Sequence, residues 1–258
     1  MDRSDESSTQ NKSARLRPPI GGATISPKSV RHPATTAPSP PRIMKIKYFI
    51  NLHKGITFFF VLGLMFIYQN FSLGPWVYLA LHGTYGFLWL IKDRLYPDKQ
   101  WEQEVPWSIG IAGFFVVGLY WIAPFLLISN PVEPPLVLVA IAISLNIFGV
   151  FLHYTSDAQK YYTLKYHKGL ITEGFFARCR NTNYLGEVMI YVAFALLAMH
   201  WLPFVILAGF VATLFIPNML KKDQSLSRYP EFEAYRSRSG LIWPNFFSTS
   251  PAPTTTKE

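Results

Sequence analysis

Apolar residues occur in long runs along this chain, and short polar segments separate the runs. Four runs come close to the roughly 20 apolar residues that a helix needs to cross a membrane. These runs are residues 55–70, 74–91, 108–129 and 135–153. A fifth apolar stretch, 184–220, is too long for one span, and His200, Trp201 and Pro203 near its middle predict a hairpin of two helices. The pattern predicts an all-α, multi-pass integral membrane bundle of about six spans.

The two ends of the chain lack such runs. Residues 1–45 are rich in Ser, Thr, Pro and basic residues, so we expect them to be disordered, because they bury too little apolar surface to offset the entropy of ordering. Residues 248–258 have a similar composition and are expected to form a loose tail. The remainder divides into N-terminal membrane helices, residues 46–139, and a C-terminal membrane region, residues 140–247, with long polar loops.

The distribution of charge orients this bundle. The net charge is +9, but the basic residues lie between apolar runs rather than on one folded surface, which argues against a nucleic-acid partner. With the N-terminus in the cytosol, the outer connections are QNFSLG, SNPVEPP and the turn around His200, and none contains Lys or Arg. Because Lys and Arg favour the cytosolic side of a membrane, we expect both termini to be cytosolic.

Cysteine and histidine restrict the metal chemistry. The single Cys179 cannot form an internal disulfide or a cysteine-based metal framework. The six His are scattered, without HxxxH or HExxH spacing. We therefore expect no metal site.

Three polar stripes lie on three of the predicted helices. Asn183, Glu187 and Tyr191 recur at every fourth position and share one helix face. The other two stripes are Tyr78, His82, Tyr85 and Trp89, and Asn146, Gly149, His153 and Asp157. An ionisable residue at membrane depth, such as Glu187, is costly and is a functional-site hypothesis by default. The alternative is that each stripe is a polar seam that joins neighbouring helices.

Two predicted inner segments, residues 154–187 and 221–247, combine Lys and Arg with many tyrosines. Cationic side chains suit phosphate oxygens, and aromatic faces suit a nucleotide base or another flat ring. The alternative is that these segments are ordinary inner loops that contact anionic lipid head groups. The acids and asparagines embedded in them favour a ligand site, because contact with head groups does not explain those residues.

Several short motifs in the C-terminal region resemble one family. They are Ser156-Asp157-Ala158-Gln159-Lys160, Gly174-Phe175-Phe176, Asn183-Tyr184-Leu185-Gly186-Glu187, Tyr235 and Leu241-Ile242-Trp243-Pro244. They make roughly residues 140–247 similar to the C-terminal region of the steroid 5-alpha-reductase family. That superfamily also contains sterol reductases and isoprenylcysteine carboxyl methyltransferases.

The resemblance implies a helical membrane fold with a cytosol-facing cavity for NADPH, and a location in the endoplasmic reticulum. The residues that it assigns to cofactor binding are Asp157, Lys165, Arg180, Asn183, Tyr184, Glu187, Asp223, Tyr235 and Arg238. His82 and Tyr85 resemble the tyrosine element with which the steroid enzymes polarise their substrate. We take these two as the candidate catalytic residues.

Two departures from the family pattern bear on the reaction. Arg180-Asn181-Thr182 stands where methyltransferases and sterol reductases commonly have Arg-His-Pro, and the missing His weakens the methyltransferase reading more. The first two predicted helices also lack the glutamate with which the steroid enzymes polarise a ketone, which argues against a steroid enone as substrate.

The preferred hypothesis is NADPH-dependent reduction of a carbon–carbon double bond in a lipid or steroid-like molecule that enters sideways from the bilayer, with Tyr85 and His82 as proton donors. The first alternative is an S-adenosylmethionine-dependent methyltransferase of a lipid or prenylated substrate. The second is a non-enzymatic membrane protein that retains the fold. The enzyme hypotheses require Asp157, Asn183, Glu187 and Tyr235 to meet around one pocket at the inner mouth of the bundle.

Overall fold

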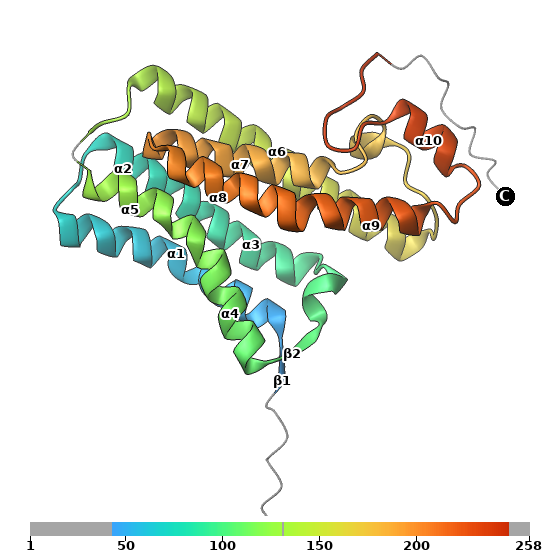
Figure 1. Cartoon of the computed structure of the whole chain (residues 1–258), viewed down its shortest axis with the longest axis horizontal. Helices are drawn as coiled ribbons and strands as arrows, with labels where there is room; N and C mark the ends of the chain where they lie inside the picture. The colour runs from blue at the N-terminus through green and yellow to red at the C-terminus, as the bar shows by residue number, and fades with distance from the viewer. Residues whose placement is uncertain (1–42, 131, 248–258) are drawn as a thin grey trace, which may run out of the picture. The chain divides into compact units, whose positions relative to one another are not determined.

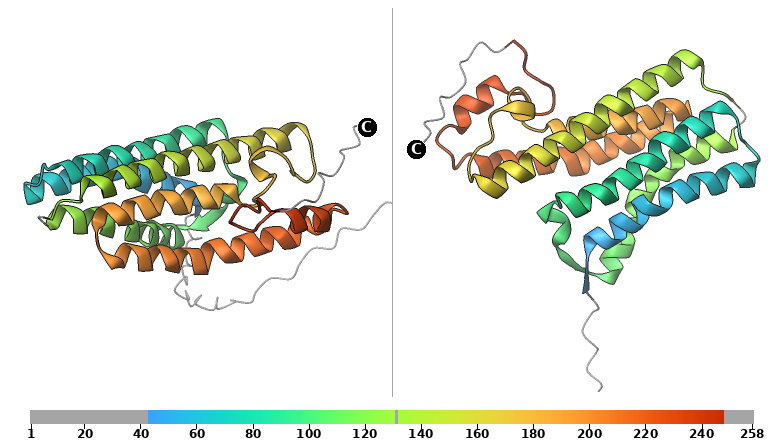
Figure 2. Two further views of the ribbon diagram at one scale, coloured as in Figure 1. Left: turned by 90° about the horizontal axis from the view of Figure 1, so that it is seen from above. Right: turned by 180° about the vertical axis from the view of Figure 1, so that it is seen from behind.

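The computed structural model describes residues 43–130 and 132–247. Within these ranges the chain is an all-α membrane bundle, as predicted (Figures 1 and 2). The expected disorder of residues 1–42 and the loose tail of residues 248–258 lie outside the described residues.

Six long helices of the described residues form the bundle. They are α1 (Ile46–Tyr68), α2 (Leu73–Tyr78) continuing through a π-helical turn into α3 (Thr84–Leu95), α4 (Trp107–Gly118) continuing through a 3-10 turn into α5 (Ile122–Ser129), α6 (Leu136–Tyr166), α7 (Thr182–Ala198), and α8 (Trp201–Phe210) continuing through a second π-helical turn into α9 (Ile216–Leu226). Four of them, namely α1, α4–α5, α6 and α8–α9, are long and apolar enough to cross a membrane. The apolar α7 is shorter, at 17 residues.

The ends of the helices differ from the predicted runs. α1 begins at Ile46 rather than at residue 55, and α6 continues to Tyr166 rather than ending at 153. Beyond its apolar part, α6 contains good helix formers such as Ala158 and Lys160, with no Gly or Pro before Gly169. Much of the two predicted inner loops is therefore helical, including the short helix α10 (Phe232–Arg238).

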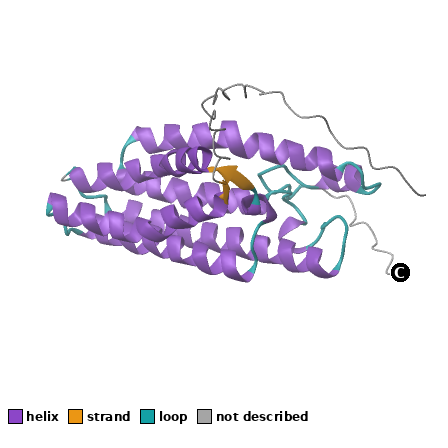
Figure 3. Cartoon of the chain, turned by 90° about the horizontal axis from the view of Figure 1, so that it is seen from below, coloured by secondary structure: helices purple, strands orange, loops and turns teal. Residues whose placement is uncertain are grey.

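A short antiparallel sheet ties the start of α1 to the segment before α4. Strand β1 (Ile43–Lys45) pairs with β2 (Glu104–Pro106), with Met44 opposite Val105 (Figure 3). The expectation that residues 43–45 are disordered is wrong. The ammonium groups of Lys45 and Lys47 lie 2.8 and 2.5 Å from the Glu102 carboxylate, and these hydrogen bonds lower the pKa of Glu102.

Helices α6 and α7 pack against each other more extensively than any other described pair, and they lie side by side in Figures 1 and 2. Two glycines allow this approach. A β-carbon on Gly149 would lie 2.7 Å from the carbonyl oxygen of Gly186, and one on Gly186 would lie 2.6 Å from the carbonyl oxygen of Gly149. Small residues at a crossing let helix backbones come close in a membrane. This crossing brings the polar stripes of α6 and α7 together.

Candidate functional site

The three polar stripes face one another inside the bundle. Tyr85 of α3 has its ring centroid 6.2 Å from that of Tyr191 on α7 and 6.5 Å from that of His153 on α6. The Trp89 ring stacks on His153 at 6.3 Å. All four side chains are buried. The stripes are thus part of one polar interior rather than three separate seams.

Lys54 of α1 lies at the centre of this interior. Its side chain is buried, with 4% of its surface exposed, and its Nζ donates a 2.8 Å hydrogen bond to the Tyr191 hydroxyl. The same Nζ lies 4.3 Å from the ring centroid of Tyr85 and 5.1 Å from that of Trp89, where the negative faces of the rings attract a cation. These partners hold the Lys54 ammonium inside the bundle.

Glu187 of α7 is the carboxylate that interacts electrostatically with this lysine. It interacts electrostatically with Lys54, Tyr85 and Tyr191. Among the described residues it forms no ion pair within 4 Å, and its side chain is partly exposed. We call Lys54, Tyr85, Trp89, Glu187 and Tyr191 the Lys54 cluster. It combines a buried cation, a carboxylate and two phenols, which are groups that hold and transfer protons.

A second charged group lies between α3 and α6. Lys92 Nζ forms a 2.7 Å ion pair with Asp157, and both side chains are buried. His153 Nε2 lies 4.0 Å from the same carboxylate, while its Nδ1 hydrogen-bonds the backbone carbonyl of Asn183 at 3.0 Å. Asp157 Oδ1 and His153 Nε2 have no hydrogen-bond partner within the described part of the chain. We call Lys92, His153 and Asp157 the Asp157 cluster.

The two residues predicted to be catalytic have different surroundings. The Tyr85 hydroxyl is next to the Tyr191 hydroxyl but forms no hydrogen bond of normal geometry. His82 Nδ1 is 3.0 Å from the Tyr78 hydroxyl, and the His82 ring stacks on Phe194 at 4.2 Å. His82 is thus held in the aromatic core, whereas Tyr85 contacts the buried cation.

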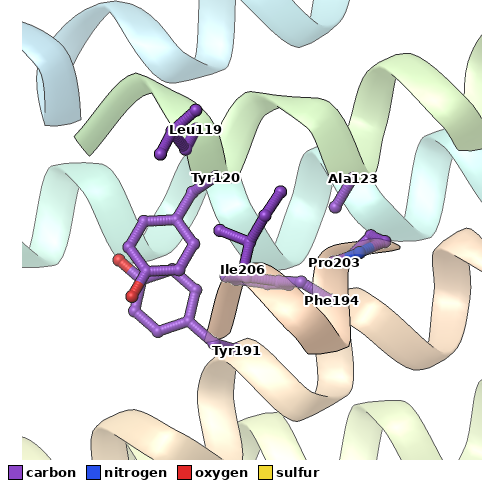
Figure 4. A pocket seen from close by; sticks show the side chains of 7 residues that line it. All are labelled: Leu119, Tyr120, Ala123, Tyr191, Phe194, Pro203 and Ile206. Atoms are coloured by element: carbon purple, nitrogen blue, oxygen red, sulfur yellow. The ribbon is translucent and has the colours of Figure 1, made fainter. Parts of the chain in front are cut away.

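A small pocket adjoins the Lys54 cluster on the side of α5, α7 and α8 (Figure 4). Its polar wall is Tyr120, whose ring stacks on that of Tyr191 at 3.7 Å. Figure 4 shows the two hydroxyl oxygens at the same end of the stack. The other lining residues are Leu119, Ala123, Phe194, Pro203 and Ile206. An apolar pocket thus ends on a pair of phenols, one of which is bound to Lys54.

Four of the predicted cofactor residues form a separate group, which holds the C-terminal segment. Arg180 forms an ion pair with Asp223 of α9 at 3.0 Å and donates further hydrogen bonds to the backbone carbonyls of Arg236 and Ser239. The Asn181 amide donates to the Leu241 carbonyl at 2.8 Å.

Tyr235 and Arg238 of α10 complete this group, which we call the C-terminal clamp (Arg180, Asp223, Tyr235 and Arg238). The Tyr235 hydroxyl donates to the Phe176 carbonyl at 2.7 Å, and burial raises the pKa of Tyr235. Arg238 is buried as well, and it contacts the Thr172 carbonyl at 3.4 Å. These contacts fix the loop before α7 against α10.

The remaining predicted cofactor residues occupy intermediate or outer positions. Asn183 and Tyr184 are partly buried in the first turn of α7, and the Tyr184 ring contacts Phe215 at 4.9 Å. Lys165 is exposed near the end of α6, where its Nζ lies over the Tyr166 ring. Asp157 and Asn183 share His153 as a neighbour, and Glu187 lies one turn further along α7. Tyr235 instead hydrogen-bonds the Phe176 carbonyl in the C-terminal clamp, so a pocket shared by all four residues stays a prediction.

The sequence alone missed the first helix as a source of site residues. Lys54 directly precedes the apolar run that the sequence predicts to begin at residue 55, so it falls outside that predicted span. His53, also buried in α1, stacks on Trp121 at 4.5 Å, and neither of its ring nitrogens has a partner among the described residues. Recognising that α1 starts at Ile46 would have placed both residues inside the bundle.

Among the described residues, no group of three or more His, Cys, Asp and Glu side chains is arranged to hold a metal.

Comparison with known proteins identifies the family. No curated protein and no solved structure matches the chain. A family described as "Protein of unknown function (DUF1295)" matches residues 92–239, which is more than half of the chain. The chain therefore belongs to the DUF1295 family.

Proposed function

We propose that this protein is a membrane-embedded oxidoreductase that uses NADPH to reduce a carbon–carbon double bond of a lipid or steroid-like molecule. The observation that carries the proposal is the Tyr85 phenol, which lies inside the bundle beside a buried lysine. The similarity of the Asn183–Glu187 motif to the steroid 5-alpha-reductase family supports the same reaction. The phenol offers a proton donor inside the bundle, and the motif is the one that the resemblance assigns to cofactor binding.

In the proposed reaction the side chains of the Lys54 cluster supply the proton and stabilise charge. When bound, NADPH would supply the hydride for one carbon of the double bond and would itself be oxidised to NADP⁺. Tyr85 donates its hydroxyl proton to the other carbon, so the lipid gains two hydrogens and Tyr85 becomes a phenolate. The phenolate is then reprotonated, with water as the final source of the proton. A fixed positive charge in a dry site stabilises negative charge that develops during such a step.

Unpaired polar atoms fit the nicotinamide end of this cofactor. Asp157 Oδ1 and His153 Nε2 are buried without hydrogen-bond partners, so they are available to a carboxamide group. Glu187 and the amide of Asn183 are partly exposed on the neighbouring helix. Arg180 is already committed to Asp223, so it is a poor phosphate ligand. The exposed Lys165, near the end of α6, and Lys221, in the middle of α9, are better placed for phosphates.

The Lys54 cluster favours this reaction over methyl transfer. S-adenosylmethionine carries a positive sulfonium, and a buried ammonium would repel a sulfonium placed beside Tyr85. A non-enzymatic scaffold has no use for a charge inside the membrane, where a lysine costs about 3 kcal/mol on insertion scales. The methyltransferase is thus the second candidate, and the scaffold is the third.

The test measures cofactor binding to the purified full-length protein in detergent. Binding is monitored by energy transfer from tryptophan to NADPH. We expect binding in the micromolar range, weakened by Glu187→Gln. The control is Glu233→Gln, because the Glu233 side chain is 74% exposed. Binding of S-adenosylmethionine without binding of NADPH would shift the assignment to a methyltransferase, and binding of neither would favour the scaffold.

A further inference from the structure

Lys54 is an unusual buried cation because its charge is only partly compensated. The other buried lysine of this interior, Lys92, has a carboxylate at 2.7 Å. Lys54 instead has a phenol as its hydrogen-bond acceptor, and within the described ranges no carboxylate lies within 4 Å of it. Burying a charge is costly unless it is paired. The placement therefore needs a reason beyond helix packing.

The position of Lys54 in α1 keeps its ammonium group inside the bundle. It is the ninth residue of α1, which puts it about 12 Å along the helix from Ile46, at a rise of 1.5 Å per residue. Its side chain turns inward, to the hydroxyl of Tyr191 and the ring of Tyr85. Two phenols thus share one ammonium group.

We infer that Lys54 is a positioning residue for proton donation: through Tyr191 and across the ring face of Tyr85, it supplies the positive charge that lets Tyr85 release its proton inside the membrane. The inference rests on the proposed role of Tyr85. A positive charge beside a phenol favours its ionised form, whereas burial alone disfavours it. Without Lys54, the phenolate left after proton donation would have no cation from the described part of the chain over its ring.

The same contacts provide a route by which Tyr85 is reprotonated. After donation, the Tyr85 phenolate can receive a proton from the Tyr191 hydroxyl, which in turn receives one from the Lys54 ammonium at 2.8 Å. Glu187, which interacts electrostatically with all three residues, is partly exposed and can return a proton from water to the lysine. Each step moves one proton, and the complete cycle restores the starting charges.

Other titratable groups also face Tyr85. They are His153 and Tyr154 on α6, Tyr191 and Glu187 on α7, and His82 on its own helix. The cation over the Tyr85 ring is Lys54, at 4.3 Å. Because Lys54 is the cation that lies over this ring, its removal is the change that tests the inference.

The experiment measures tyrosine ionisation in the purified full-length protein without any ligand. The near-ultraviolet absorbance of tyrosinate is followed during an alkaline titration, and the same titration in a Tyr85→Phe background isolates the contribution of Tyr85. In Lys54→Met we expect that contribution to move to higher pH by about one unit or more. Lys54→Arg, which keeps the charge, should return it toward the wild-type position.

Controls separate this role from a structural one. Lys47→Met removes another lysine of α1, which pairs with Glu102 instead, and it should leave the Tyr85 titration unchanged. If Lys54→Met does not fold, Lys54→Gln serves as the neutral variant. An unchanged Tyr85 titration in the neutral variant, or an equal shift in Lys47→Met, would overturn the inference. Because no NADPH is present, this outcome is independent of whether NADPH binds.

Discussion

At the scale of single residues, the structure separates groups placed for chemistry from groups placed for folding. Lys54, Tyr85 and Glu187 lie together in the membrane interior, with unsatisfied charge and an unpaired hydroxyl. Arg180 and Asp223 instead satisfy each other, and Arg180 also holds two backbone carbonyls. The family resemblance assigned three of these five residues, Glu187, Arg180 and Asp223, to cofactor binding. The contacts indicate that the clamp residues shape the site from outside.

This distinction predicts the effect of Asp223→Asn. The change leaves the buried Arg180 guanidinium without its ion-pair partner, and breaking one side of a buried pair costs about 3 kcal/mol or more. We expect a clear fall in the melting temperature of the protein in detergent. Glu233→Gln breaks an exposed pair with Arg236 and should have almost no effect. Equal melting temperatures for the two variants would contradict the structural role of the clamp.

At the scale of the helices, the crossing of α6 and α7 is the feature on which the site depends. Gly149 and Gly186 let the two backbones approach, and that approach puts His153 beside Asn183. Larger side chains at this crossing would separate the polar stripes. The packing of these helices therefore positions the chemistry as well as the fold.

A pair of matched substitutions tests this crossing. Gly149→Ala adds a methyl group 2.7 Å from a backbone oxygen, whereas Gly63→Ala on α1 adds the same methyl group with nothing within 4 Å. We expect Gly149→Ala to lower the melting temperature and the yield of folded protein, and Gly63→Ala to be neutral or slightly stabilising. Equal melting temperatures for Gly149→Ala and Gly63→Ala would show that close approach at this crossing is not needed for stability.

The helices could be predicted from the sequence, but their polar ends could not. Apolar runs locate the membrane-embedded parts, because burial in lipid requires long apolar segments. The helical continuation of α6 beyond 153 and the start of α1 at Ile46 leave no such signal, since polar residues form helices equally well. The helical spacing of Asn183, Glu187 and Tyr191 correctly predicted a shared face. The inward direction of Lys54 depends on tertiary packing, so no local pattern revealed it.

At the scale of the whole molecule, we propose that the ends of the described bundle differ in charge and lie on opposite sides of the membrane. The connections after α1, α5 and α7 carry no Lys or Arg, whereas the segments after α3, α6 and α9 carry many. The positive-inside rule predicts that the second set faces the cytosol. Cofactor from the cytosol would then reach the Asp157 cluster from this basic end.

Glycosylation mapping tests this orientation. An acceptor sequon inserted between α7 and α8, next to His200, should be modified in microsomes, because that turn is expected to lie in the lumen. A sequon inserted after α6, near Lys168, should remain unmodified. The opposite pattern would reverse the orientation and separate the proposed cofactor site from cytosolic NADPH.

The most direct measurement of the central claim is hydride transfer itself. Full-length protein is incubated with total membrane lipids and NADPH that carries deuterium at the transferable position of its nicotinamide, and the lipids are then analysed by mass spectrometry. We predict that deuterium appears in a lipid fraction with wild-type protein and falls by about a hundredfold with Tyr85→Phe, the range for loss of a general acid. Absence of deuterium from every lipid fraction, or equal labelling by the two proteins, would contradict the account.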